Sequence, residues 1–237
     1  MLTRPSQQHA ADNRSASAQA RGVRCVQGMQ NVDTATGPGI APASIGIEDV
    51  AAFHGHLCPS LALGFRIARW ALRMLQCPRP HTDELVVVAE SVDSALDAIQ
   101  YVAGCTLGKR TLIVRDYGKR AYTFYDRRDG KGIRIGVTYT GLADTPRLTE
   151  LRELLESGTA SFAQRQEYFA RAQARLDFIL SAPEEDFLTV GPARHPMPSP
   201  GARDRWGQCT ICREPTMESK LTLKKGMLVC HECADRY

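Results

Sequence analysis

Two groups of side chains in this 237-residue sequence have the types and the spacing of metal ligands. The first group is in the segment FHGHLCP, residues 53–59, where His54, His56 and Cys58 stand at every second position. The second group consists of two CxxC pairs, Cys209 with Cys212 and Cys230 with Cys233. Imidazole and thiolate groups are common ligands of Zn²⁺ and of other transition metals. Both segments are therefore candidate metal sites.

The first group lies immediately before an expected helix. Pro59 suits the first turn of a helix, because the N–H that proline lacks would have no partner there. Cys58 would then be the N-cap, where the helix dipole and free N–H groups favour a thiolate. Two imidazoles and one thiolate suit Zn²⁺, Ni²⁺ or Fe²⁺, and three protein ligands leave a coordination position open.

Two other interpretations of this first group stay open. One treats Cys58 as a buried helix cap, with His54 and His56 hydrogen-bonded to the backbone. The other treats Cys58 as a catalytic nucleophile, with His54 or His56 as its general base. Cys105 follows an expected helix in the turn segment Gly104-Cys105-Thr106, which would carry it into the same pocket; by itself it is more often a core residue.

The four cysteines near the end of the sequence have the spacing of a zinc ribbon, with seventeen residues between the two CxxC pairs. An intervening hairpin with its turn at Lys225-Gly226 would bring the pairs together around one Zn²⁺. Four thiolates complete the tetrahedral shell, so we expect a structural zinc site. Two disulfides or a redox CxxC pair are the alternatives, and we favour them less because no export signal is present.

Charge and composition restrict the functional classes. The net charge is +4, and residues 194–237 carry eight basic against five acidic side chains. Four thiolates on Zn²⁺ would offset most of that local excess, so we do not favour nucleic-acid binding and expect the ribbon to contact a protein partner. No apolar run is long enough for a membrane span. Metal-bound thiolates indicate a reducing compartment, and we expect a cytoplasmic protein.

The expected elements predict an α+β fold, a mixed sheet with helices followed by a small zinc-ribbon domain. Strand-like runs at 85–90, 111–118, 120–127 and 132–139 are interleaved with helical patterns, and Asp129-Gly130 predicts a hairpin. A further short strand is expected at 187–193. We divide the chain into a disordered leader (1–45), an α+β core (46–190), a linker (191–205) and the zinc ribbon (206–237).

Residues 46–180 resemble the E-subunit family of formylmethanofuran dehydrogenase. The resemblance rests on the ordered motifs HGHxCP, GCTxGK, DYGK and GKG, and longer members of that family also carry a C-terminal zinc ribbon. It implies an intertwined homodimer and a metal-binding pocket lined by the HGHxC and GCT motifs. The implied pocket residues are His54, His56, Cys58 and Cys105. Their implied neighbours are Lys109, Asp116, Tyr117 and Lys119.

Two positions depart from the family pattern. Ser60 replaces the glycine that usually follows Cys-Pro, which alters a position where the backbone approaches closely. Ser94 stands where the family often has a cysteine. Serine is a poor ligand for a soft metal, and it excludes disulfide chemistry between position 94 and Cys58 or Cys105.

From these observations we predict a metal-binding accessory or regulatory protein, with a transition metal in the core and a structural zinc ribbon. We expect it to be non-catalytic or an accessory subunit of an oxidoreductase, because the sequence has no recognisable pterin, dinucleotide or phosphate-binding motif. The alternatives are a cysteine-dependent enzyme that uses Cys58 and a regulator whose ribbon binds nucleic acid. The resemblance does not by itself transfer the dehydrogenase reaction.

Overall fold

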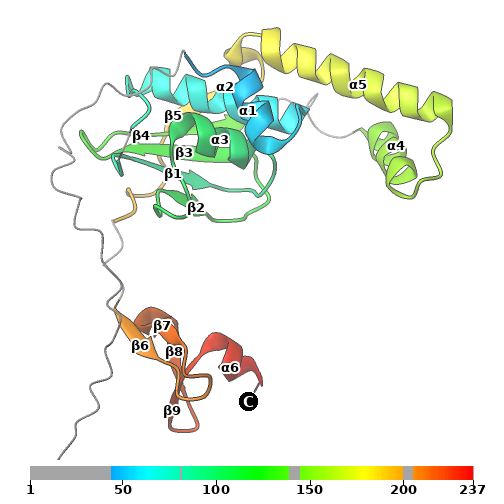
Figure 1. Cartoon of the computed structure of the whole chain (residues 1–237). Helices are drawn as coiled ribbons and strands as arrows, with labels where there is room; N and C mark the ends of the chain where they lie inside the picture. The colour runs from blue at the N-terminus through cyan, green and yellow to red at the C-terminus, as the bar shows by residue number, and fades with distance from the viewer. Residues whose placement is uncertain (1–43, 81, 139–144, 200–204, 237) are drawn as a thin grey trace, which may run out of the picture. The chain divides into compact units, whose positions relative to one another are not determined.

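A five-stranded mixed sheet forms the centre of the protein in this computed structural model, which describes residues 44–80, 82–138, 145–199 and 205–236 (Figure 1). The strand order is β2-β1-β3-β4-β5. β1 and β2 are parallel, and the other neighbouring pairs are antiparallel. The strands are β1 (Leu85–Ala89), β2 (Leu112–Val114), β3 (Ala121–Asp126), β4 (Gly132–Val137) and β5 (Leu188–Pro192). The α+β class expected from the sequence is confirmed. Residues 1–43 of the expected leader lie outside the described residues.

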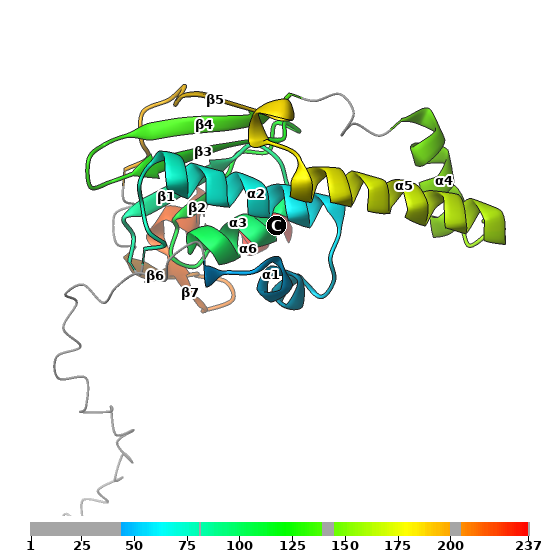
Figure 2. The ribbon, with the colours of Figure 1, turned by 90° about the horizontal axis from the view of Figure 1, so that it is seen from above.

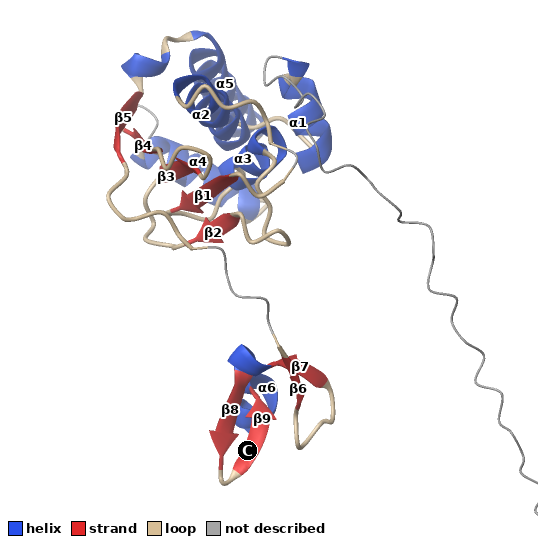
Figure 3. Cartoon of the chain, turned by 90° about the vertical axis from the view of Figure 1, so that its left-hand side faces the viewer, coloured by secondary structure: helices blue, strands red, loops and turns tan. Residues whose placement is uncertain are grey.

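Two helices cover one face of this sheet, α2 (Pro59–Met74) and α3 (Ala95–Ala103), and α1 (Ile47–His54) packs against both helices (Figure 3). Alternate residues of β1 point to opposite faces, as the period of a strand requires. Leu85 and Val87 belong to the main core together with residues of α2 and α3, whereas Val86 and Val88 belong to a small cluster with Tyr125. Ala193 and Met197 pack against this small cluster, so both faces are covered and all five residues of β1 are buried.

Two further helices follow the hairpin, α4 (Pro146–Glu156) and α5 (Phe162–Ser181). The C-terminal part of α5 packs against α2, and Arg66 of α2 donates hydrogen bonds to the carbonyl oxygens of Ile179 (2.6 Å) and Ala182 (2.7 Å). α5 runs past the N-terminal end of α2, and α4 lies against the part of α5 that extends beyond α2 (Figure 2). No helix in the described ranges has both the length and the apolar character of a membrane span.

The strand ends follow the local turn chemistry. The hairpin predicted at Asp129-Gly130 joins β3 and β4, and Gly130 has the positive φ (73°) that such a turn needs. The run at 111–118 forms a shorter strand than expected. Asp116 accepts a hydrogen bond from the amide of Gly118 (3.1 Å), and Gly118 is left-handed at φ 65°. This turn ends β2 at Val114, because the backbone leaves the extended conformation.

The cysteine-rich segment contains two hairpins and a short helix. β6 (Trp206–Gln208) pairs with β7 (Pro215–Met217), and β8 (Leu221–Lys224) pairs with β9 (Met227–Cys230), which α6 (His231–Arg236) follows. The predicted turn at Lys225-Gly226 has positive φ at both residues (49° and 77°), the pattern of a tight hairpin turn. The two hairpins with their four-cysteine cluster match the small domain that the sequence predicted. The exact domain boundaries stay predictions.

Candidate metal centres

The core site is built at the junction between two helices. α1 ends at His54, and Gly55 reverses the chain in a left-handed conformation (φ 101°) that glycine adopts without a steric penalty. α2 begins at Pro59, with Cys58 as its N-cap. The three donor residues therefore come from one helix end, one connecting loop and one helix start, and the loop is too short to separate them.

The donor atoms of His54, His56 and Cys58 lie within 4.8 Å of one another. The two imidazole rings are tilted by 37°, with their centroids 4.8 Å apart. His54 and Cys58 are half-buried, and His56 is exposed. The Cys58 sulfur accepts a hydrogen bond from the amide of Leu61 (3.4 Å), so the expected N-cap is observed. The structure thus brings together three of the four core residues proposed from the sequence.

His54 has the hydrogen-bonding pattern of a metal-bound histidine. Its Nδ1 lies 2.7 Å from the Oδ2 atom of Asp97, on α3. Its Nε2 is buried and has no hydrogen-bond partner among the described residues. A buried polar atom without a partner is costly unless something binds it. With Nδ1 held by the Asp97 carboxylate, Nε2 is the ring nitrogen left to bind a metal ion, and the group of His54, His56 and Cys58 fits such an ion.

Cys105 lies in a different environment. Its side chain is fully buried, and its thiol donates a hydrogen bond to the carbonyl oxygen of Leu85 (3.2 Å). Burial raises the pKa of the Cys105 thiol to about 12, so the group is protonated at neutral pH. Cys105 is not part of the cluster of donor atoms formed by His54, His56 and Cys58. Its surroundings are those of a packed core cysteine.

A cavity of about 290 Å³ opens beside Cys58. Its polar lining includes Ser60 and Ser94, the two positions that depart from the family pattern, and three arginines: Arg120, Arg152 and Arg175. Its remaining lining comes from α2, α4 and α5: Pro59, Leu148, Tyr168 and Ala172. The implied neighbours Lys109, Asp116, Tyr117 and Lys119 do not line this cavity. The departures from the family pattern are thus concentrated beside the donor cluster.

The second site is the group formed by the four cysteines of the two hairpins, Cys209, Cys212, Cys230 and Cys233, whose sulfur atoms lie within 4.8 Å of one another. Four thiolates at about 2.3 Å from a tetrahedral zinc would be roughly 3.8 Å apart. The Cys212 and Cys230 sulfurs are 3.9 Å apart, which fits that geometry and is too long for a disulfide. The amide of Cys230 donates to the Cys209 sulfur (3.3 Å), which stabilises a thiolate. The cluster is therefore consistent with a zinc ribbon.

Several site residues could not be recognised from the sequence. Asp97 is 43 positions from His54, and only the packing of α1 against α3 brings their side chains together. Arg152 and Arg175 lie on helices that are rich in charged residues, a pattern typical of a solvent-exposed helix. Nothing in that pattern marked these two arginines as cavity residues. One signal in the sequence pointed to this region. Ser94, where the family often has a cysteine, is three positions before Asp97 and lines the cavity.

Comparison with known proteins identifies the family of the chain. The family model described as "FmdE, Molybdenum formylmethanofuran dehydrogenase operon" matches residues 53–189. A solved structure, a tungsten formylmethanofuran dehydrogenase FmdE-like protein from Syntrophus aciditrophicus, has a TM-score of 0.53 and 20% identity. The alignment covers 83% of this chain and 96% of that one. At this identity the likeness supports a shared fold.

A relative from Archaeoglobus fulgidus, named a probable S-adenosyl-L-methionine-binding protein, is 29% identical over 197 residues. The match covers 78% of this chain and 51% of the relative, so the chain spans about half the length of that curated protein.

Proposed function

Because the chain belongs to the FmdE family, we propose that it is a metal-binding accessory or regulatory protein whose core holds a transition metal at His54, His56 and Cys58. The family match spans residues 53–189 and so includes the whole donor cluster. Two imidazoles and a thiolate suit Zn²⁺, and also Ni²⁺ or Fe²⁺. The four cysteines of the ribbon would hold a separate structural Zn²⁺.

The observation that carries this proposal is the buried Nε2 atom of His54. Asp97 holds the other ring nitrogen at 2.7 Å, which fixes the orientation of the ring. Nε2 is left without a hydrogen-bond partner among the described residues, and His54 belongs to a group of three donor residues close enough to share one metal ion. A carboxylate behind a metal-ligating histidine is a recurrent arrangement in metal sites. A bound cation would satisfy the atom that the protein leaves without a partner.

Three protein donors leave at least one coordination position for an exogenous group. A metal bound there would supply Lewis-acid chemistry. Cys58 is both a proposed ligand and part of the cavity lining, so the metal site would lie beside the cavity. This property suits a protein that senses, delivers or binds a small ligand.

Metal analysis of Cys58→Ala tests the proposal. We expect two metal ions per purified wild-type chain, one at the core site and one in the ribbon, and one metal ion per chain in the variant. Cys77→Ala is the matched control, because Cys77 is a buried core cysteine that is not a member of either cluster. It should keep both ions. Unchanged metal content in Cys58→Ala would refute the core site.

A cysteine-dependent enzyme is the second candidate, and the position of Cys58 favours it. The Cys58 sulfur caps a helix and accepts an amide hydrogen bond, and His54 and His56 are near enough to act as its general base. In that case the core would purify without metal and Cys58 would react rapidly with iodoacetamide. A ligated cysteine would be protected until the metal is removed.

The name of the Archaeoglobus relative raises the question of S-adenosylmethionine binding. This molecule carries a net positive charge at neutral pH, because its sulfonium and ammonium groups outnumber its one carboxylate. Three arginines line the core cavity, so their charge opposes such a ligand. We therefore do not assign S-adenosylmethionine to the core cavity.

Two kinds of protein contact belong to the same proposal. A homodimer would cover apolar side chains that α5 exposes, among them Phe162 and Phe169. A protein partner would contact the ribbon, where Trp206, Leu223 and Leu228 are exposed. The proposal also includes a cytoplasmic location, because the seven described cysteines form no disulfide and thiolate ligands need a reducing environment.

A further inference from the structure

We infer that the cavity beside Cys58 binds a small organic anion, whose carboxylate or phosphate group is held by Arg120, Arg152 and Arg175. The inference rests on the proposed function and adds to it a class of ligand for the cavity beside the core metal site. The cavity, its charge and its apolar wall carry it.

The positive charge of the cavity has three separate origins. Arg120 immediately precedes β3, Arg152 is on α4, and Arg175 is on α5. All three are half-buried, which strengthens their electrostatic effect relative to exposed side chains. Asp93 lies 3.6 Å from Arg120 and offsets one of the charges. The described lining itself contains no carboxylate. Each guanidinium has five N–H donors, so an arginine that also contacts a protein group can still bind an anion.

The rest of the lining indicates an organic ligand. Leu148, Ala172 and the ring of Tyr168 supply an apolar wall, and the hydroxyl groups of Ser60 and Ser94 supply further hydrogen-bonding groups. Ligand cavities typically have volumes of about 300–1,000 Å³. At about 290 Å³, this cavity suits a small molecule that has an apolar part as well as an acid group. Arginine matches both carboxylate and phosphate, because its guanidinium forms two parallel hydrogen bonds with either group.

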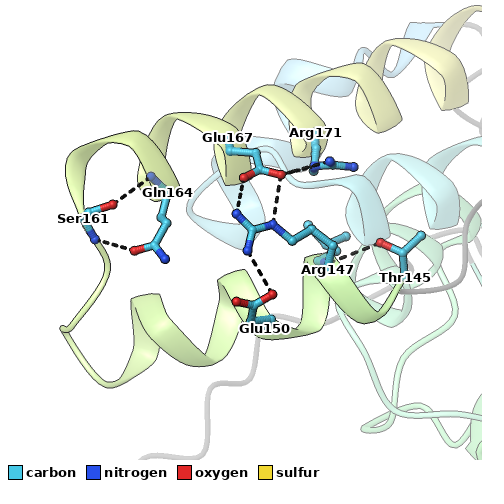
Figure 4. A network of polar contacts seen from close by, with 8 residues as sticks. Thr145, Arg147, Glu150, Ser161, Gln164, Glu167 and Arg171 are labelled. Atoms are coloured by element: carbon cyan, nitrogen blue, oxygen red, sulfur yellow. Dashed lines mark hydrogen bonds and ion pairs between the residues drawn. The ribbon is translucent and has the colours of Figure 1, made fainter.

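The α4 and α5 side of the cavity is held in place by a polar network (Figure 4). Arg147 of α4 donates two hydrogen bonds to the carboxylate of Glu167 on α5, at 3.1 and 2.5 Å. Arg147 also contacts Glu150 (2.9 Å), and Arg171 joins Glu167 from the same helix (3.0 Å). These contacts link α4, which carries Arg152, to α5, which carries Arg175.

Titration of the full-length protein with phenyl phosphate and benzoate tests the inference, with neutral benzamide as the uncharged control. We expect at least one anion to bind and benzamide not to bind. The stronger anion identifies whether the acid group is a phosphate or a carboxylate. Arg152→Gln and Arg175→Gln should each weaken binding by roughly 10- to 100-fold, the effect of losing one charge-assisted hydrogen bond.

Arg165→Gln is the matched control, because it removes the same charge from α5 at an exposed position that does not line the cavity and is not part of the network around Glu167. It should change the affinity less than twofold. Thermal unfolding of each variant shows whether it is folded, and Arg175→Lys, which keeps the charge, should retain more affinity than Arg175→Gln. Absence of anion binding to the wild-type protein, or equal losses in all three glutamine variants, would overturn the inference. Metal content is measured separately, so a failure of the core metal site is distinguishable from a failure of anion binding.

Discussion

His54 shows how single residues create the core site. Its two ring nitrogens have different surroundings: one contacts the Asp97 carboxylate at 2.7 Å, and the other is buried without a partner in the described structure. The side chain of His54 is 15% exposed, so water cannot freely replace a missing ligand. Asp97 is therefore as important to the proposed site as the donors themselves, although it does not belong to the donor cluster.

Asp97→Asn should weaken metal binding at the core site. The amide cannot hold the imidazole in the same tautomer, and loss of such a partner typically costs about 10- to 100-fold in metal affinity. Competition with a chromophoric chelator measures the affinity of the weaker of the two sites, while the ribbon serves as an internal reference. Asp177→Asn, on the exposed part of α5, is the control and should leave both affinities unchanged. Equal metal affinities of Asp97→Asn and wild type would show that this carboxylate does not support metal binding at the core site.

At the scale of elements, the site depends on how closely α2 and α3 approach each other. α2 begins at the Cys58 cap, and α3 carries Asp97. Their contact is made where Gly64 faces the backbone of Ala95. A Cβ atom at residue 64 would lie 2.3 Å from the Ala95 carbonyl oxygen and 2.6 Å from its Cα. Only glycine permits this approach, because no backbone atom of α3 can move aside cheaply.

Gly64→Ala should therefore destabilise the protein and disturb the metal site. Forcing one methyl group into a packed contact costs about 1–3 kcal/mol, and α3 would have to move away from α2. Chemical denaturation gives the change in the free energy of unfolding, and metal titration follows the site. Gly108→Ala is the control, since no atom lies within 4 Å of its added Cβ. A Gly64→Ala protein as stable as Gly108→Ala would contradict the close contact.

At the scale of the whole molecule, the core and the ribbon differ in what stabilises them. The main core contains a large set of buried apolar side chains from α2, α3 and the sheet. The described part of the ribbon has three buried cluster residues, and two of them are the proposed zinc ligands Cys209 and Cys233. So small an apolar cluster cannot offset the loss of chain entropy, and the metal would supply most of the missing stability.

Removal of metal should therefore unfold the ribbon and leave the core folded. After treatment with a strong chelator, amide exchange should become fast across residues 206–236, while residues 85–137 stay protected. Cys209→Ser should reproduce the ribbon effect without a chelator. Cys58→Ala should leave amide exchange in the ribbon unchanged. Persistent protection of the ribbon in the metal-free protein would show that it does not depend on zinc.

The sequence by itself determined the local features. Strand periodicity, the Asp129-Gly130 turn, Pro59 after Cys58 and the CxxC pairs all predicted the observed elements, because each depends on a few neighbouring residues. The close grouping of His54, His56 and Cys58 was also predictable in this way, since all three lie within five consecutive residues. The turn at Asp116 was missed, and the expected strand there proved shorter.

Only the tertiary structure decided which distant residues meet. It brings Asp97 to His54 across 43 positions and Arg175 to a cavity that Cys58 lines. It also buries Cys105, whose thiol donates a hydrogen bond to the Leu85 carbonyl oxygen. No sequence pattern encodes these contacts, because they depend on how helices pack against each other and on which face of a helix becomes buried. Ligand spacing is a property of short loops, whereas second-sphere partners and cavities are properties of packing.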